Sequence, residues 1–139
     1  MNSSLLRTLL KTVAAATVLA TTLAAQAGDV VVVMAPGAAA LSKDQVANLY
    51  LGRANDLKVL DLPDGNPVRE SFYKKATDRD SAQIKAVWSR VVFTGKGQPP
   101  KEMPDAAAVK KAVAADPKVV GYIEKSAADA SVKVVLELD

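Results

Sequence analysis

The sequence contains no cysteine and no histidine among its 139 residues. These absences exclude disulfides, thiolate nucleophiles, zinc sites built from Cys and His, and the Ser-His-Asp triad. A metal site made only of carboxylates, or a Lys/Ser catalytic pair, stays open, but no pattern indicates either. Asp78 and Asp80 are typical of helix boundaries. We therefore predict a protein that is not an enzyme, with no catalytic residue, no metal and no cofactor.

Aromatic residues are also scarce, at 4%, while half of the chain is apolar and 24% is charged. This mixture is typical of a folded protein and excludes a disordered one. The length suits a single domain.

The N-terminus has the three parts of an export signal. Arg7 and Lys11 precede an apolar stretch, which ends in Ala25-Gln26-Ala27, a small-x-small cleavage pattern. The apolar stretch is shorter than the about 20 residues that a membrane-spanning helix needs. We predict a cleaved signal peptide over residues 1–27 and a periplasmic or secreted single domain over residues 28–139.

The positive charge of the chain depends on this N-terminal segment. Without Arg7 and Lys11, 16 of the 18 basic residues remain against 15 acidic ones, a net charge of +1. Nucleic-acid binding requires a far more basic surface. We predict no nucleic-acid partner and no transmembrane segment after cleavage.

Hydrophobic periodicity divides the remaining chain into strands and helices. The run of β-branched residues before Pro36 predicts a strand that is buried on both faces, hence central in a sheet covered by helices. We expect strands over residues 29–34, 57–62, 119–123 and 132–138, and helices over residues 43–51, 67–76, 81–93 and 104–116. The pattern predicts a small α/β domain with a mixed sheet of about four strands and helices packed on it.

Four segments carry a family resemblance. In order they are Leu41–Gly52, Asp64-Gly65-Asn66, Gly95-Lys96-Gly97 and Val119–Ile123. In these segments the chain resembles one lobe of the periplasmic phosphate-binding proteins of ABC transporters, which have the type II periplasmic-binding-protein fold. Over the longer run from Trp88 to Pro100 it is similar to short exported proteins of the phosphate-transporter substrate-binding kind.

The resemblance implies an exported solute-binding-like protein that binds phosphate or another small anion. By this resemblance, Asp64 stands at the position of a family aspartate that accepts a hydrogen bond from protonated phosphate. This chain departs from the pattern, because Leu62 replaces an arginine, and Pro67 and Val68 replace Gly-Thr. Pro67 lacks a backbone N–H that could bind an anion. Binding should therefore be weak. The alternative is a non-enzymatic periplasmic module that keeps the lobe as a scaffold and binds an envelope or transporter protein instead of a small ligand.

The candidate ligand-binding residues are Asp64, Gly65, Asn66, Lys96 and Gly97. Asp64-Gly65-Asn66 has an alternative interpretation as an ordinary turn and helix cap. Lys96 between two glycines is equally typical of a flexible basic loop, because the hydroxyl residue of a P-loop is missing.

Two further features concern the helices over 67–93. Trp88 and Phe93 could line a pocket, but Trp88 lies on the apolar stripe with Val91 and Val92, so we expect it in the core beside the 30–33 strand. Several basic residues could form one face that docks an acidic partner or anionic lipid, or could be only solvated. They are Arg69, Lys74, Lys75, Arg79, Lys85 and Arg90.

Overall fold

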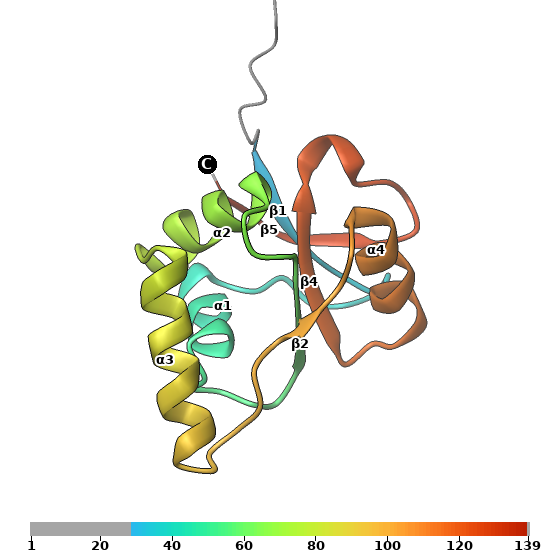
Figure 1. Cartoon of the computed structure of the whole chain (residues 1–139). Helices are drawn as coiled ribbons and strands as arrows, with labels where there is room; N and C mark the ends of the chain where they lie inside the picture. The colour runs from blue at the N-terminus through green and yellow to red at the C-terminus, as the bar shows by residue number, and fades with distance from the viewer. Residues whose placement is uncertain (1–28, 139) are drawn as a thin grey trace, which may run out of the picture.

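The computed structural model describes residues 29–138, and the predicted signal peptide lies outside them. Residues 29–138 form five strands and four helices. Figure 1 shows how they are arranged. In chain order the elements are β1 (Val30–Met34), α1 (Lys43–Tyr50), β2 (Lys58–Asp61), α2 (Pro67–Thr77), α3 (Ser81–Phe93), β3 (Lys101–Glu102), α4 (Ala106–Ala115), β4 (Val119–Glu124), the 3₁₀ turn η2 (Lys125–Ala127) and β5 (Lys133–Leu138).

The strands form one mixed sheet in the order β3-β2-β4-β1-β5. β2 runs parallel to both β3 and β4, whereas β1 is antiparallel to β4 and β5. The mixed α/β fold class is therefore confirmed. The two-residue strand β3 was not predicted, because Lys101 and Glu102 carry no hydrophobic signal and pair with β2 only through the backbone.

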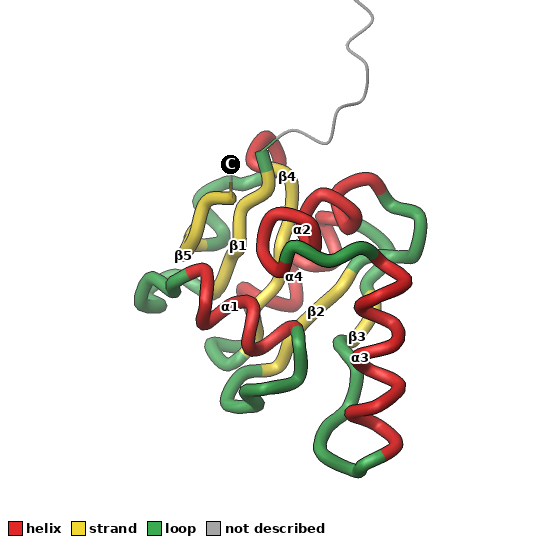
Figure 2. The backbone as a smooth tube through the Cα atoms, turned by 90° about the vertical axis from the view of Figure 1, so that its left-hand side faces the viewer, coloured by secondary structure: helices red, strands yellow, loops and turns green. Residues whose placement is uncertain are grey.

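Helices cover both faces of the sheet, with α4 on one side and α1, α2 and α3 on the other (Figures 1 and 2). Strand β1 is buried along its whole length between β4 and β5, as its unbroken apolar run predicts. Helix α4 approaches β4 very closely at Gly121, where an added Cβ would lie 2.6 Å from Val109 Cγ1. Glycine is favoured there because a side chain would force Val109 to shift.

The last strand does not show the simple alternation that its sequence suggests. Val135 is buried, while Val134 and Leu136 are half-buried. The register against β1 shifts between Val32 and Val33, so Val135 is an extra residue in the ladder. A β-bulge of this kind reverses the faces of the residues that follow it.

Local signals set the helix boundaries near the candidate site. Ser42 and Gln45 form a capping box at the start of α1, and Gly52 follows that helix at φ +74°. Asn66 caps α2, whose first residue is Pro67. Asp78 ends α2 in the left-handed conformation and Asp80 caps α3, so both are helix-boundary residues as predicted. These caps fix where α2 and α3 begin beside the end of β2.

Trp88 is in the core as expected, at 8% exposed, and its indole N–H donates to the Tyr50 carbonyl over 2.9 Å. It belongs to the same core cluster as Val30–Val33. The prediction that Val92 shares this core is wrong, since Val92 is 49% exposed and Phe93 is 92% exposed. Helix α3 buries only Ile84 and Trp88, because it lies at the margin of the molecule (Figure 2).

Candidate functional site

A buried carboxylate stands at the C-terminal end of β2. Asp61 is 7% exposed and accepts hydrogen bonds from the hydroxyls of Tyr73 and Tyr122, the first over 2.5 Å. The backbone N–H of Leu62 also donates to it, over 2.9 Å. Three donors are what an ionised carboxylate needs when it is removed from water. Strand β2, helix α2 and strand β4 are therefore joined at one polar point inside the core.

The tyrosines around Asp61 belong to a packed aromatic cluster. Phe72 stacks on Tyr122 with ring centroids 3.9 Å apart, and Tyr50 and Tyr73 meet them edge to face. Burial first, and the Asp61 carboxylate second, raise the pKa of Tyr50, Tyr73 and Tyr122 far above the ordinary tyrosine value. All three hydroxyls therefore stay protonated and act as hydrogen-bond donors.

Arg69, in the first turn of α2, is the buried cation of the site. Its side chain is 9% exposed and forms two ion pairs, Nε to Asp61 at 3.6 Å and Nη1 to Asp64 at 3.4 Å. Burial is the largest single effect and by itself would lower the pKa of the guanidinium. The electrostatic interactions with Asp61 first, and with the neighbouring groups including Asp64, together outweigh burial, so the pKa is raised. No described residue hydrogen-bonds to the buried Nε. A buried guanidinium whose Nε–H has no acceptor has unused donor capacity.

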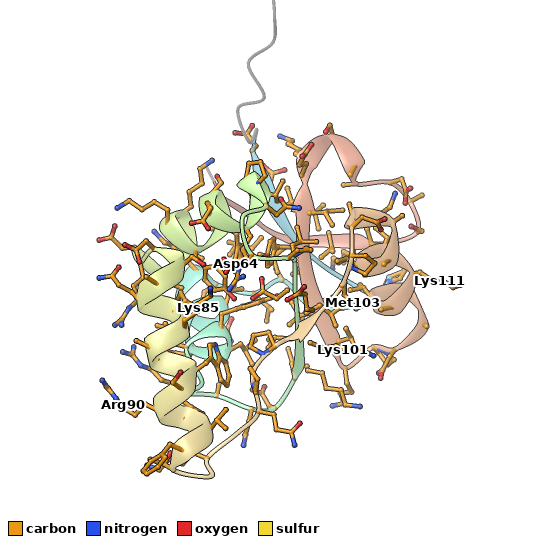
Figure 3. All side chains as sticks on the ribbon, viewed as in Figure 1. Asp64, Lys85, Arg90, Lys101, Met103 and Lys111 are labelled. Atoms are coloured by element: carbon orange, nitrogen blue, oxygen red, sulfur yellow. The ribbon has the colours of Figure 1, made fainter. Side chains whose placement is uncertain are left out.

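Asp64 links this buried cluster to the surface. Its carboxylate accepts hydrogen bonds from the ammonium of Lys85 and from the hydroxyl of Ser81, both on α3, the latter over 3.0 Å. Hydrogen bonding from Lys85, then from Ser81, lowers the pKa of Asp64. Figure 3 shows Asp64 and Lys85 turned toward each other on the side of α3 that faces the sheet.

These charged groups form one end of an open groove, which we call the Arg69 groove. Its polar end consists of Asp61, Asp64, Arg69 and Lys85, and Glu102 also borders it; the remaining lining is Ile84, Trp88, Ser89, Val92, Phe93, Pro99 and Pro100. The formal charges of the four polar-end residues cancel. The groove therefore offers both donors and acceptors beside apolar walls, which suits a small polar ligand that carries hydrogens of its own.

The predicted residues of the 64–66 turn contribute unequally. Asp64 borders the groove, whereas Gly65 is an exposed turn residue at φ +85°. The Asn66 side chain accepts the N–H of Val68 over 2.8 Å and thus caps α2. With Pro67 lacking an N–H and Val68 bonded to the cap, the first two positions of α2 hold no free donor for an anion.

Lys96 and Gly97 lie elsewhere. Both border a hollow under the 96–101 loop, between that loop and β2, which also includes Trp88 and Met103. Neither lines the Arg69 groove. The structure thus brings Asp64 together with Arg69 and Lys85, and not with Lys96.

Sequence reasoning missed the cation of this site. With Leu62 in the arginine position the turn appeared to have none, but the fold places Arg69 against Asp64. The signal was available, because Arg69, Phe72, Tyr73 and Ala76 recur at helical spacing on the buried face of α2. The basic residues predicted to share one face also lie on separate parts of the surface. Arg69 and Lys85 line the groove, and Lys74 pairs with Asp78 at 3.6 Å.

Residues 29–138 contain no group of three or more acidic residues placed to hold a metal ion. Within the same range, no helix combines the length and apolarity that crossing a membrane requires.

No family model and no curated protein sequence matches the chain. Solved structures do match it. One is an ABC-type phosphate transport receptor from Vibrio cholerae, with a TM-score of 0.60 and 17% identity; it matches 77% of this chain and 45% of the receptor. Another is a putative phosphate ABC transporter substrate-binding protein with bound phosphate from Clostridium perfringens, with a TM-score of 0.61 and 18% identity; it matches 77% of this chain and 44% of that protein.

These likenesses confirm the predicted resemblance at the level of the fold. The chain has the fold of a part of these phosphate receptors, and it spans less than half of their length.

Proposed function

We propose that this chain is an exported solute-binding-like protein, not an enzyme, that binds phosphate or another small protonated oxyanion weakly in the Arg69 groove. The observation that carries the proposal is the buried guanidinium of Arg69, whose ion pairs at 3.4 and 3.6 Å leave its Nε–H without a hydrogen-bond acceptor. The fold likeness to phosphate receptors supports the same ligand class.

The charges of the groove select the protonation state of the ligand. Asp61 and Asp64 balance Arg69 and Lys85, so a dianion finds no net attraction. A ligand that still carries protons can accept from Arg69 and donate to a free lone pair of Asp64. We therefore expect phosphate to bind better than sulfate, and phosphate binding to strengthen as the pH falls from about 8 to about 6 and phosphate gains a proton.

The groove also explains why the binding is weak. It is open to solvent along Pro99, Pro100 and Phe93, and water screens every contact that the ligand makes. Charged hydrogen bonds contribute about 1.5–3 kcal/mol each. Two of them, with little enclosure, correspond to a dissociation constant of roughly high micromolar or weaker.

Isothermal titration of residues 28–139 with phosphate and with sulfate tests the proposal. Lys85→Gln removes an exposed cation from the groove and should weaken phosphate binding several-fold without unfolding the protein. Lys111→Gln removes an exposed cation from α4, far from the groove, and is the matched control. Equal phosphate affinity in both variants would rule out binding in the Arg69 groove.

The second candidate is a scaffold that binds a periplasmic protein partner in place of a small ligand. The observation that favours it is Phe93, which is 92% exposed beside Val92 at the rim of the groove. Exposed apolar residues grouped in this way are typical of protein interfaces. Two results together would favour the scaffold: isothermal titration that detects no binding of any tested oxyanion, and a protein partner whose binding is lost in Phe93→Ser.

A further inference from the structure

Four cationic side chains lie near the side of α3 that faces away from the Arg69 groove. Arg53 follows α1, Arg79 lies between α2 and α3, Arg90 is on α3, and Lys96 follows that helix. All four line one shallow groove, which we call the cationic groove. Figure 3 shows Arg90 on the outer side of α3, turned away from Asp64 and Lys85. The cationic groove is therefore distinct from the Arg69 groove.

No counter-charge compensates this cluster within residues 29–138. The lining of the groove contains no Asp or Glu, and none of the four cations forms an ion pair with a described residue. The two carboxylates that flank Arg79 in sequence are engaged elsewhere, since Asp78 pairs with Lys74 and Asp80 accepts the N–H of Gln83 as the cap of α3. Four uncompensated positive charges around one groove create a positive potential that attracts an anionic partner.

The floor of the cationic groove is apolar. Leu51, Val87 and Val91 form it between the cations. Gly52 also lines the groove and packs against Val91, so that an added Cβ would lie 2.9 Å from Val91 Cγ2. Gly52 has φ +74°, which favours glycine, and the chain can therefore pass close to α3 at this point. The groove thus has a fixed apolar base and a charged rim.

We propose that the cationic groove binds an acidic segment of a partner polypeptide, in which an apolar side chain lies between carboxylates. The apolar side chain would cover Leu51, Val87 and Val91, and the flanking carboxylates would meet the arginines in bidentate pairs. A free inorganic anion gains nothing from the apolar floor. A lipid headgroup presents its charge first and keeps its apolar tails in the membrane, away from a concave floor. A peptide segment uses both parts of the groove.

This inference does not depend on small-anion binding in the Arg69 groove. The two grooves use different residues of α3. The Arg69 groove is lined by Ile84, Lys85, Trp88, Ser89, Val92 and Phe93, and the cationic groove by Val87, Arg90 and Val91. A protein without phosphate affinity could still bind the acidic segment.

Fluorescence anisotropy with synthetic peptides tests the proposal. The probe is a labelled peptide in which single leucines alternate with pairs of glutamates, and its comparison is an all-glutamate peptide of equal charge. Arg79→Glu/Arg90→Glu should weaken leucine-peptide binding by at least about tenfold, because two attractions become repulsions. The matched control is Lys43→Glu/Lys111→Glu, two exposed lysines outside the groove, for which the net charge change is similar. It should change affinity less than about threefold.

Three results would overturn the proposal. Equal loss in the control pair would show that net charge alone attracts the peptide. Equal binding of the all-glutamate peptide or of inorganic tripolyphosphate would show that the apolar floor has no part. Binding to vesicles of anionic phospholipid, without peptide binding, would assign the surface to a membrane. If Arg79→Glu/Arg90→Glu unfolds at a markedly lower temperature than the unmodified protein, Arg53→Gln/Lys96→Gln provides the same test with a smaller perturbation. This second variant should weaken leucine-peptide binding at least about threefold.

Discussion

Tyr73 donates its hydroxyl hydrogen to Asp61 over 2.5 Å, and both side chains are buried. This bond joins α2 to the end of β2, and the Tyr122 hydroxyl joins β4 to the same carboxylate. The carboxylate in turn holds Arg69 in the first turn of α2. The polar end of the Arg69 groove is therefore supported from inside the hydrophobic core.

The tyrosines predict cooperative alkaline unfolding. The chain has three tyrosines, and all three have a raised pKa in the folded state. In the unfolded state they ionise near pH 10, so the unfolded protein binds fewer protons above that pH. The contribution of the three protonated tyrosines to stability is therefore fully present below about pH 10. Above that pH the free energy of unfolding falls, by up to about 4 kcal/mol per pH unit for three groups.

Ultraviolet absorbance of tyrosinate and far-ultraviolet circular dichroism, recorded together against pH, check this prediction. Both signals should change in one steep transition. A gradual tyrosine titration centred near pH 10 with unchanged dichroism would show that the hydroxyls are accessible in the folded protein.

Trp88→Ala should lower the free energy of unfolding by about 3–5 kcal/mol, since it removes a buried aromatic side chain and leaves a cavity. It also deprives the Tyr50 carbonyl of the indole donor. Urea unfolding measures the change, and Trp88→Phe should recover part of the loss because the ring volume is largely kept. An unchanged midpoint in Trp88→Ala would place the indole outside the core.

Gly121→Ala should destabilise the protein by about 1–3 kcal/mol, because the added methyl group overpacks the contact between α4 and β4. The new Cβ would lie 2.6 Å from Val109 Cγ1. Val109→Ala opens space there and should partly restore the stability of the Gly121→Ala variant. Thermal unfolding of the single and double variants measures these stability changes. If the stability losses of the two single variants simply add in the double variant, the two residues do not clash.

Export predicts a defined N-terminus. Mass spectrometry of protein recovered from the periplasm or medium should give a chain that begins at Gly28, because Ala25-Gln26-Ala27 fits the cleavage pattern. Recovery of the full-length chain in the membrane fraction would contradict this prediction.

Much of the fold was predictable because its signals are local. The continuous run of Val30–Val33 indicated a central strand, and the turn with Asn66 indicated a helix cap, both of which the structure confirms. The short strand β3 and the bulge at Val135 arise from backbone pairing between distant segments. Such pairing leaves no periodic pattern in the sequence.

The candidate site was only partly predictable, for a different reason. Asp64 was identified from the turn that contains it, but its cation comes from the next helix and not from the preceding strand. Arg69 looked like one of several surface cations because its burial depends on how α2 packs against Asp61. Tertiary packing, not local sequence, decides which charged residue is inside.

The most direct test of the central claim follows the Arg69 side chain itself. In a nitrogen-15 NMR titration of residues 28–139, the Arg69 guanidinium signals should shift progressively with phosphate and saturate at roughly millimolar concentration, because a bound oxyanion would accept a hydrogen bond from a guanidinium whose Nε–H now has no acceptor. Sulfate should shift them less. Saturation of the Lys96 and Gly97 signals by phosphate while those of Arg69 stay unchanged would contradict the account and assign the anion to the loop after α3.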